Sequence, residues 1–113
     1  PLLQGFLAAN PSWHALMTTG TASSARLMAT RLPARAFHQV FPLDHPRWVQ
    51  RFHQAWKPDA ALWMESELWP NHLLALAAAR IPAALVNARM TPRSAAAWSR
   101  WPRAISTLLQ TFT

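Results

Sequence analysis

The stretch AALWMESELWPNHLLALAAARIPAALVNAR, residues 60–89, decides the fold because it contains a strand, a helix and a second strand in succession. Its two ends, AALWM and IPAALVNAR, are short apolar runs bounded by proline and polar residues, a pattern typical of strands. Between them, residues 68–80 carry apolar side chains at the spacing of one helical face: Leu73, Leu76 and Ala77. This order predicts two parallel strands joined by a crossover helix.

The same alternation of strands and helices extends over the rest of the chain. The expected elements are a helix tail over 2–9, a strand over 13–19, a helix over 22–32, a strand over 36–43, a helix over 46–56 capped by Asp44, and a helical region from about 93 that Pro102 interrupts. Because the apolar runs do not alternate with polar residues, we expect the strands to be buried on both faces. These features predict an α/β fold in which a Rossmann-like parallel sheet is flanked by helices.

The charge balance indicates an anionic partner. Eleven basic residues, ten of them arginine, stand against four acidic ones, and the formal net charge is +7. The guanidinium group is a planar donor fork that suits phosphate and carboxylate, so a phosphorylated substrate, a nucleic acid or an acidic membrane surface would fit. The alternative is a compositional bias toward alanine, arginine, proline and tryptophan, which requires no partner.

Several kinds of site are unsupported by the sequence. The chain has no cysteine, which excludes disulfides and thiolate metal sites. The five histidines form no HExxH motif, so we predict no metal site and no cofactor, and His53 is expected to be a half-buried or surface residue. No apolar run reaches the length of about 20 residues that a membrane-spanning helix needs. The chain does not begin with methionine, so we expect it to start inside a longer protein.

Polar residues follow the predicted strands at their carboxyl ends, the edge at which open parallel sheets bind their ligands. Thr19, Gly20 and Thr21 follow the first strand, and Gly20 would allow backbone N–H groups to approach an anion. An ordinary turn into the next helix explains the same three residues. Asn87 and Arg89 follow the last strand and complete this polar rim.

Two of the four acidic residues, Glu65 and Glu67, come directly after the strand that ends at residue 64. Either carboxylate could act as a general base, accept hydrogen bonds from sugar hydroxyls or orient a nearby arginine. In the alternative interpretation, Ser66 caps the following helix and Glu67 complements the positive end of its dipole. That alternative leaves Glu65 unexplained.

The segment 87–103 interleaves basic and indole side chains: Arg89, Arg93, Trp98, Arg100, Trp101 and Arg103. This combination suits a surface of phosphate-rich lipid headgroups, and it equally suits single-stranded nucleic acid, whose bases stack on indoles. The alternative is a solvated helix face whose tryptophans pack inward.

Together these motifs resemble the 3-deoxy-D-manno-octulosonic acid (Kdo) transferase family. Its members carry E-[TS]-E-L-W-P-N followed by I-P-x-x-x-x-N-A-R-[LM]-[ST]-x-R-S, which matches residues 65–71 and 81–94 here. The stretches LMTTGTASSARL (16–27) and KPDAALWM (57–64) are similar to two further segments of the family. The resemblance covers essentially the whole chain in order.

The resemblance implies an inverting glycosyltransferase of the GT-B fold, with residues 1–113 as part of its N-terminal, acceptor-side domain and the C-terminal nucleotide-sugar domain absent from the chain. Such enzymes transfer Kdo from CMP-Kdo to the lipid A precursor in lipopolysaccharide biosynthesis, at the cytoplasmic face of the bacterial inner membrane. The family's general base is a glutamate in a Gly-Glu pair upstream of the first helix. We therefore expect residues 1–113 alone to be inactive.

The resemblance also implies site residues and partners. Glu65 and Glu67 are expected to be supporting catalytic acids, and substrate contacts are expected from Thr19, Gly20, Thr21, Asn87, Arg89, Arg93 and Ser94. The implied partners are CMP-Kdo, the lipid A precursor and the anionic inner-membrane surface, with no nucleic acid. The alternative function is a non-enzymatic basic module that binds anionic lipid or nucleic acid.

Overall fold

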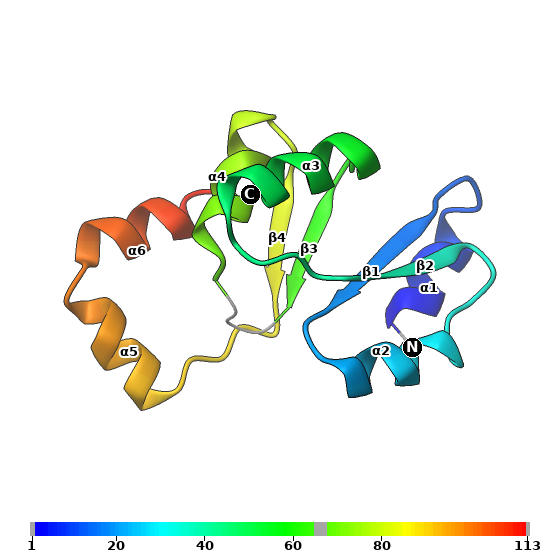
Figure 1. Ribbon diagram of the computed structural model, residues 1–113, viewed down its shortest axis with the longest axis horizontal. Coiled ribbons are helices and arrows are strands. Elements are labelled where there is room, and N and C mark those ends of the chain that lie inside the picture. Colours follow the sequence, from blue (N-terminus) through cyan, green and yellow to red (C-terminus); the bar gives the residue numbers. More distant parts are fainter. Residues whose placement is uncertain (1, 65–67, 113) are drawn as a thin grey trace. The chain divides into compact units, whose positions relative to one another are not determined.

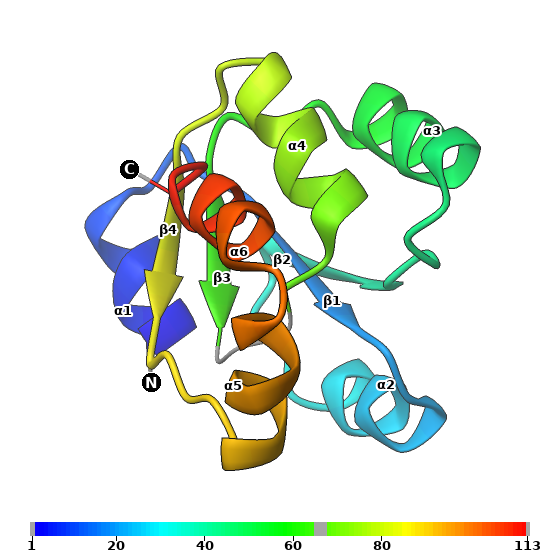
Figure 2. The ribbon, with the colours of Figure 1, turned by 90° about the vertical axis from the view of Figure 1, so that its left-hand side faces the viewer.

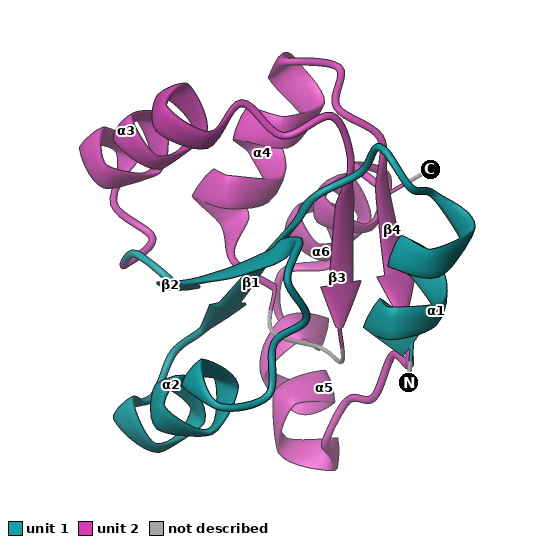
Figure 3. Ribbon diagram, turned by 90° about the vertical axis from the view of Figure 1, so that its right-hand side faces the viewer, with its two compact units in different colours: residues 1–42 teal, residues 43–113 magenta. Residues whose placement is uncertain are grey.

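The computed structural model describes residues 2–64 and 68–112, and it divides into two compact units, residues 1–42 and 43–113 (Figure 3). The first unit contains α1 (Leu2–Ala9), β1 (Ala15–Thr19), α2 (Ala22–Ala29) and β2 (Ala36–Val40). The second unit contains α3 (Pro46–Trp56), β3 (Ala61–Met64), α4 (Pro70–Ala78), β4 (Ala83–Val86), α5 (Pro92–Ser99) and α6 (Pro102–Leu109) (Figure 1).

In the first unit, β1 and β2 run parallel, with Ala15 opposite Ala36 and Thr19 opposite Val40. Helix α2 forms the crossover and packs against β2. It begins after Thr21, whose side-chain oxygen accepts a hydrogen bond from the backbone N–H of Ser24 at 3.2 Å. This N-cap stabilises the start of the crossover helix because it satisfies one of its free donors.

The guanidinium group of Arg35 holds the carboxyl end of α1. Its Nη2 donates to the carbonyl oxygen of Leu7 at 2.6 Å, and its Nη1 donates to those of Asn10 at 2.9 Å and Trp13 at 2.7 Å. A cation at this end of a helix satisfies carbonyl groups without a helical partner and complements the helix dipole. Arg35 therefore stabilises the fold of the first unit, and its guanidinium group is hydrogen-bonded to backbone carbonyl groups.

In the second unit, β3 and β4 run parallel from Ala61 opposite Ala83 to Met64 opposite Val86, with α4 as the crossover. Helix α6 lies in front of this pair in Figure 2, and it packs against α4. Helix α3 packs on α4. The buried apolar side chains of this unit are Val49, Leu73, Leu76, Ala83 and Leu108.

The predicted α/β class, with parallel strands flanked by helices, is confirmed. Where the sequence predicted one sheet, the described residues form two parallel pairs, one in each unit. The expectation of strands buried on both faces is wrong for β2 and β3, because Phe37 is 48% exposed and Leu62 is 49% exposed. A run of apolar residues favours a strand whether or not both faces of that strand are buried. The apolar runs therefore predicted more burial than β2 and β3 show.

The prediction that Asp44 caps the helix next to it is wrong. Helix α3 is capped by His45, whose ring Nδ1 accepts from the N–H of Arg47 at 3.3 Å, and not by Asp44. Helix α4 begins at Pro70 after Trp69, whose side chain makes no cap hydrogen bond. Ser66, which the alternative interpretation made the cap of this helix, lies outside the described residues. Asp44 supplies the missing cap for α4 from a distant part of the chain, as described below.

The carboxyl-terminal helical region is divided as the sequence predicts. Helix α5 ends at Ser99, and α6 begins at Pro102, which lacks the N–H that a continuous helix would require. Among the helices of the described residues, none has both the length and the apolar character needed to cross a membrane.

Candidate functional site

The candidate site of the second unit lies at the carboxyl ends of β3 and β4. Met64 and Val86 are the last paired residues of these strands, so the segments that follow leave the sheet at the same edge. Glu65 and Glu67, which follow Met64 in sequence, lie outside the described residues. Their role as supporting acids therefore stays a prediction.

Asn87, directly after β4, turns the chain out of the sheet. Its φ of 53° lies in the left-handed region, which asparagine tolerates better than most residues. Arg89 follows two residues later and is exposed, as is Arg93 in the first turn of α5. Two guanidinium groups thus lie on the segment that leaves the carboxyl edge, where they are accessible to an anion.

Ser94 takes part in capping α5. Its backbone N–H donates to the side-chain oxygen of Thr91 at 3.1 Å, which fixes the first turn of the helix. The same turn carries Arg93. Because this contact uses the backbone of Ser94, it leaves the predicted substrate contact of its hydroxyl untested.

Asp44 anchors the start of α4, a contact that the sequence analysis missed. Its Oδ2 accepts from the backbone N–H of Asn71 at 3.0 Å, and its Oδ1 accepts from that of His72 at 3.1 Å. The side-chain amide of Asn71 donates to the carbonyl oxygen of Asp44 at 2.8 Å. These bonds fix the last residue of the ELWPN motif, and local pattern gives no signal for them because the partners are 27 and 28 residues apart.

A small apolar pit adjoins Arg89. Its volume is about 140 Å³, and the described residues that line it are Leu68, Leu85, Ala88, Arg89, Met90 and Leu109. The pit therefore joins the entry to α4, the end of β4 and the last turn of α6.

In the first unit, the polar residues after β1 have defined local partners. The hydroxyl of Thr19 lies 2.7 Å from Nε2 of His38 on the neighbouring strand, a pairing that the sequence analysis missed. Thr21 caps α2. A side chain at Gly20 would meet no atom within 4 Å, so local packing does not require glycine there. These contacts fit an ordinary turn, and substrate binding by the three residues stays a prediction.

Two histidines meet between α3 and α4. His53 Nε2 lies 3.2 Å from His72 Nδ1, and His72 is 1% exposed. His53 is half-buried, and burial lowers its pKa below the ordinary value because the charged imidazolium is poorly solvated there. It also lines a shallow groove of about 730 Å³ between these helices. Within residues 2–64 and 68–112, no three histidine or acidic side chains form a metal-binding group.

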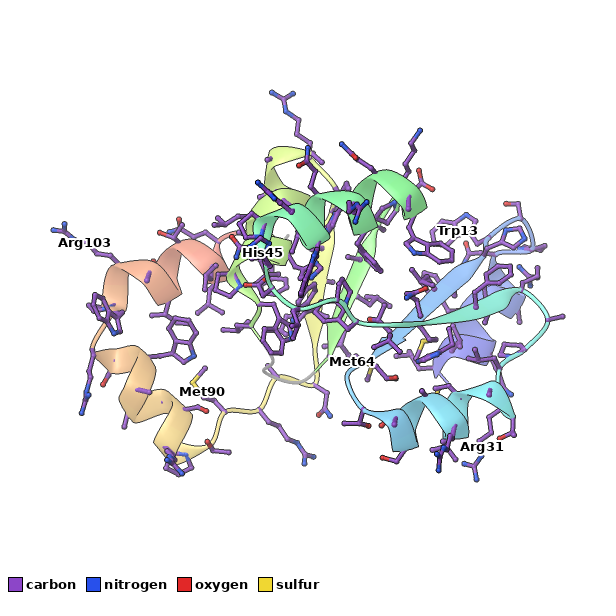
Figure 4. All side chains as sticks on the ribbon, in the orientation of Figure 1. Trp13, Arg31, His45, Met64, Met90 and Arg103 are labelled. Atoms are coloured by element: carbon purple, nitrogen blue, oxygen red, sulfur yellow. The ribbon has the colours of Figure 1, made fainter. Side chains whose placement is uncertain are left out.

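The exposed part of the α5–α6 region is basic and aromatic. Trp101 is 67% exposed, and the neighbouring residues Arg100 and Arg103 are also exposed. Figure 4 shows the side chain of Arg103 extending away from α6. Trp98 is half-buried, so the inward packing considered for both tryptophans holds only in part.

Comparison with known families gives one consistent match. The family model described as 3-deoxy-D-manno-octulosonic-acid transferase (kdotransferase) matches residues 1–113. A probable mitochondrial 3-deoxy-D-manno-octulosonic acid transferase of Arabidopsis thaliana is 45% identical over 84 residues, which are 74% of this chain and 19% of the relative.

Bacterial relatives carry the same enzyme name. The 3-deoxy-D-manno-octulosonic acid transferase of Rickettsia bellii is 40% identical over 80% of this chain and 21% of its own length. That of Haemophilus influenzae is 33% identical over 84% of this chain and 22% of its own length. The chain thus spans about a fifth of these curated relatives. No solved structure shows a significant match.

Proposed function

This chain belongs to the Kdo transferase family, and we propose that the protein containing it transfers Kdo from CMP-Kdo to a lipid A precursor in lipopolysaccharide biosynthesis. One observation carries this proposal: the family model matches residues 1–113. The family match does not favour the alternative of a non-enzymatic basic module, since the relatives are named as transferases.

The proposed reaction is inverting. A hydroxyl of the acceptor attacks the anomeric carbon of Kdo from the face opposite to CMP, the bond to CMP breaks, and a general base removes the hydroxyl proton. We propose a GT-B architecture in which residues 1–113 form part of the acceptor-side domain. The chain spans about a fifth of its relatives, so the transfer is proposed for the whole protein, and residues 1–113 alone are expected to be inactive.

Within this chain, the basic residues after β4 are proposed to hold the anionic groups of the substrates. Arg89 and Arg93 are exposed on one short segment, and guanidinium groups bind phosphate and carboxylate with two parallel hydrogen bonds. Asn87 is proposed to present its amide at the same edge. Glu65 and Glu67 are proposed to position the attacking hydroxyl or these arginines.

We further propose that the protein works at the cytoplasmic face of the bacterial inner membrane. The exposed indole of Trp101 and the cations of Arg100 and Arg103 support this, because tryptophan favours the headgroup region and arginine is attracted to anionic lipid. These residues form an adsorbing surface, which does not require a membrane-spanning helix.

The test is Kdo transfer from CMP-Kdo to a tetraacylated lipid A precursor by the protein expressed from the complete reading frame. A Glu65→Gln variant removes one candidate acid, and a Glu67→Gln variant removes the other. Asp59→Asn is the matched control, because Asp59 is an exposed acid outside the proposed site.

Transfer by the wild type and by Asp59→Asn, with loss of activity in Glu65→Gln at unchanged stability, is the expected result. Full activity in both glutamate variants would show that neither carboxylate takes part in catalysis. Absence of transfer by the wild type, with the protein folded, would refute the proposed function itself.

A further inference from the structure

The pit beside Arg89 has the lining of a site for an apolar group. Its apolar walls come from three parts of the second unit: Leu68 before α4; Leu85, Ala88 and Met90 at and after the end of β4; and Leu109 at the end of α6. Figure 4 places Met90 on the loop between β4 and α5. Among the described lining residues, Arg89 alone has a polar side chain.

The size of the pit limits what it can hold. Its volume is about 140 Å³, close to the roughly 150 Å³ of an apolar cavity that stays dry and accepts benzene. A group of about six carbon atoms therefore fits, whereas a whole sugar ring with its hydroxyls would lose hydrogen bonds to water. An alkyl segment is the best chemical match.

The charge of the pit's lining favours an anionic ligand. Among the described lining residues none is acidic, and Arg89 carries a positive charge. Arg89 itself lines the pit and is exposed, so its guanidinium group is accessible to a phosphate whose alkyl chain enters the pit. The charge and the apolar walls together fit a phosphorylated amphiphile.

We propose that this pit binds the part of an alkyl or acyl chain that lies next to the headgroup of the phosphorylated lipid acceptor, with Arg89 holding a phosphate of the same molecule. The identity of the acceptor rests on the proposed function, whereas the chemical class of the ligand rests on the pit. Binding there places the acceptor at the carboxyl edge of β3 and β4, next to Asn87.

Binding of ethyl, butyl and hexyl phosphate, all below their micelle-forming concentrations, tests this proposal on the protein expressed from the complete reading frame. Met90 supplies a local probe, since its ¹³C-labelled methyl resonance is assigned by its loss in Met90→Leu. We expect that resonance to shift on titration and the affinity to rise about tenfold for every two methylene groups that enter the pit.

Variants separate the two parts of the site. Ala88→Phe fills the pit and should abolish the dependence on chain length, while Arg89→Gln should weaken all three ligands by a similar factor. Leu109→Ala enlarges the pit and should raise the affinity for hexyl phosphate more than for ethyl phosphate. Ala55→Phe, at an exposed position of α3, is the matched control and should change neither property.

Affinity independent of chain length in the wild type would overturn the proposal. So would a chain-length dependence that survives Ala88→Phe, because the alkyl group would then bind elsewhere. A third contrary result is an unshifted Met90 resonance together with a large loss of stability in Ala88→Phe, which would show that another part of the protein fills the pit. Failure of Kdo transfer with the expected binding intact would refute the proposed function and leave this site in place.

Discussion

Asp44 accepts a hydrogen bond from the backbone N–H of Asn71 at 3.0 Å, although the two residues are 27 positions apart. The same carboxylate accepts from the N–H of His72, and the side chain of Asn71 returns a bond to the carbonyl oxygen of Asp44. A negative charge thus lies at the positive end of α4, where the side chain of the N-cap residue, Trp69, makes no cap hydrogen bond. Asp44, which lies two residues before the start of α3, therefore stabilises α4.

Asp44→Ala should loosen the first turn of α4. Two backbone N–H groups lose a charged acceptor, which costs about 2 kcal/mol and should speed hydrogen exchange at the Asn71 and His72 amides about thirtyfold. Asp44→Asn keeps one acceptor oxygen and should have a smaller effect. Hydrogen exchange at these amides is measured by NMR, with Asp59→Ala as the control. Equal exchange rates in Asp44→Ala and wild type would contradict the capping of α4 by Asp44.

Arg35→Ala should destabilise the first unit by about 2 kcal/mol, because three carbonyl oxygens lose a charged donor. Arg35→Lys should recover part of that loss, since an ammonium group cannot reproduce the planar fork. The midpoint of urea denaturation measures both effects. Arg31→Ala is the matched control, as Arg31 is an exposed arginine in the same unit. A similar shift of the urea midpoint in Arg31→Ala would show that the loss of any positive charge destabilises the protein, and not the loss of the three hydrogen bonds of Arg35.

The order of strands and helices could be predicted because it depends on local pattern. Apolar runs gave the strands, and Pro46 and Pro102 lie at the first positions of α3 and α6, where a missing N–H is harmless. Pro46 therefore marked a helix start correctly, and Pro102 marked the break in the carboxyl-terminal helical region. The sequence also indicated the segments that leave the carboxyl edge of β3 and β4, because these positions follow directly from strand order.

The anchors of the fold could not be predicted, since they join residues distant in sequence. Asp44 was expected to cap the helix next to it, but His45 caps α3 and Asp44 reaches α4. The contact between His53 and His72 is likewise set by the packing of two helices and not by spacing within one. Capping preferences identify suitable residues, and only tertiary structure decides which helix they serve.

His53 should make the second unit less stable in acid. Its neutral ring can share a hydrogen bond with His72, while its buried Nδ1 has no hydrogen-bond partner among residues 2–64 and 68–112. Burial lowers the pKa of His53 below 6.5. The unfolded chain therefore binds the proton more readily than the folded chain, so the free energy of unfolding falls as pH falls through 6.5 and continues to fall until the folded protein is protonated.

The comparison of His53→Gln with wild type tests this pH dependence. Glutamine can still donate to His72 but does not titrate, so the loss of stability between pH 7 and pH 5 should be smaller in the variant, as measured by urea denaturation at each pH. His14→Gln, an exposed histidine of the first unit, should keep the wild-type slope. Equal slopes in His53→Gln and wild type would assign the acid sensitivity to other groups.

The start of α5 allows capping and substrate binding to be separated. Thr91 accepts a hydrogen bond from the backbone N–H of Ser94 through its side chain. Thr91→Ala should therefore destabilise α5 by about 1 kcal/mol, and Thr91→Ser should be close to wild type because it keeps the acceptor. Hydrogen exchange in the first turn of α5 measures both changes.

Ser94→Ala leaves that cap in place, because the N–H group that donates to Thr91 belongs to the backbone. If the hydroxyl of Ser94 contacts substrate as the family motif implies, Ser94→Ala should lower Kdo transfer while exchange in α5 stays unchanged. A hydrogen bond lost to a charged substrate group corresponds to about a tenfold rise in KM. Unchanged KM and kcat in Ser94→Ala, beside lower activity in Thr91→Ala, would show that this turn acts by holding Arg93 in position and not through the serine hydroxyl.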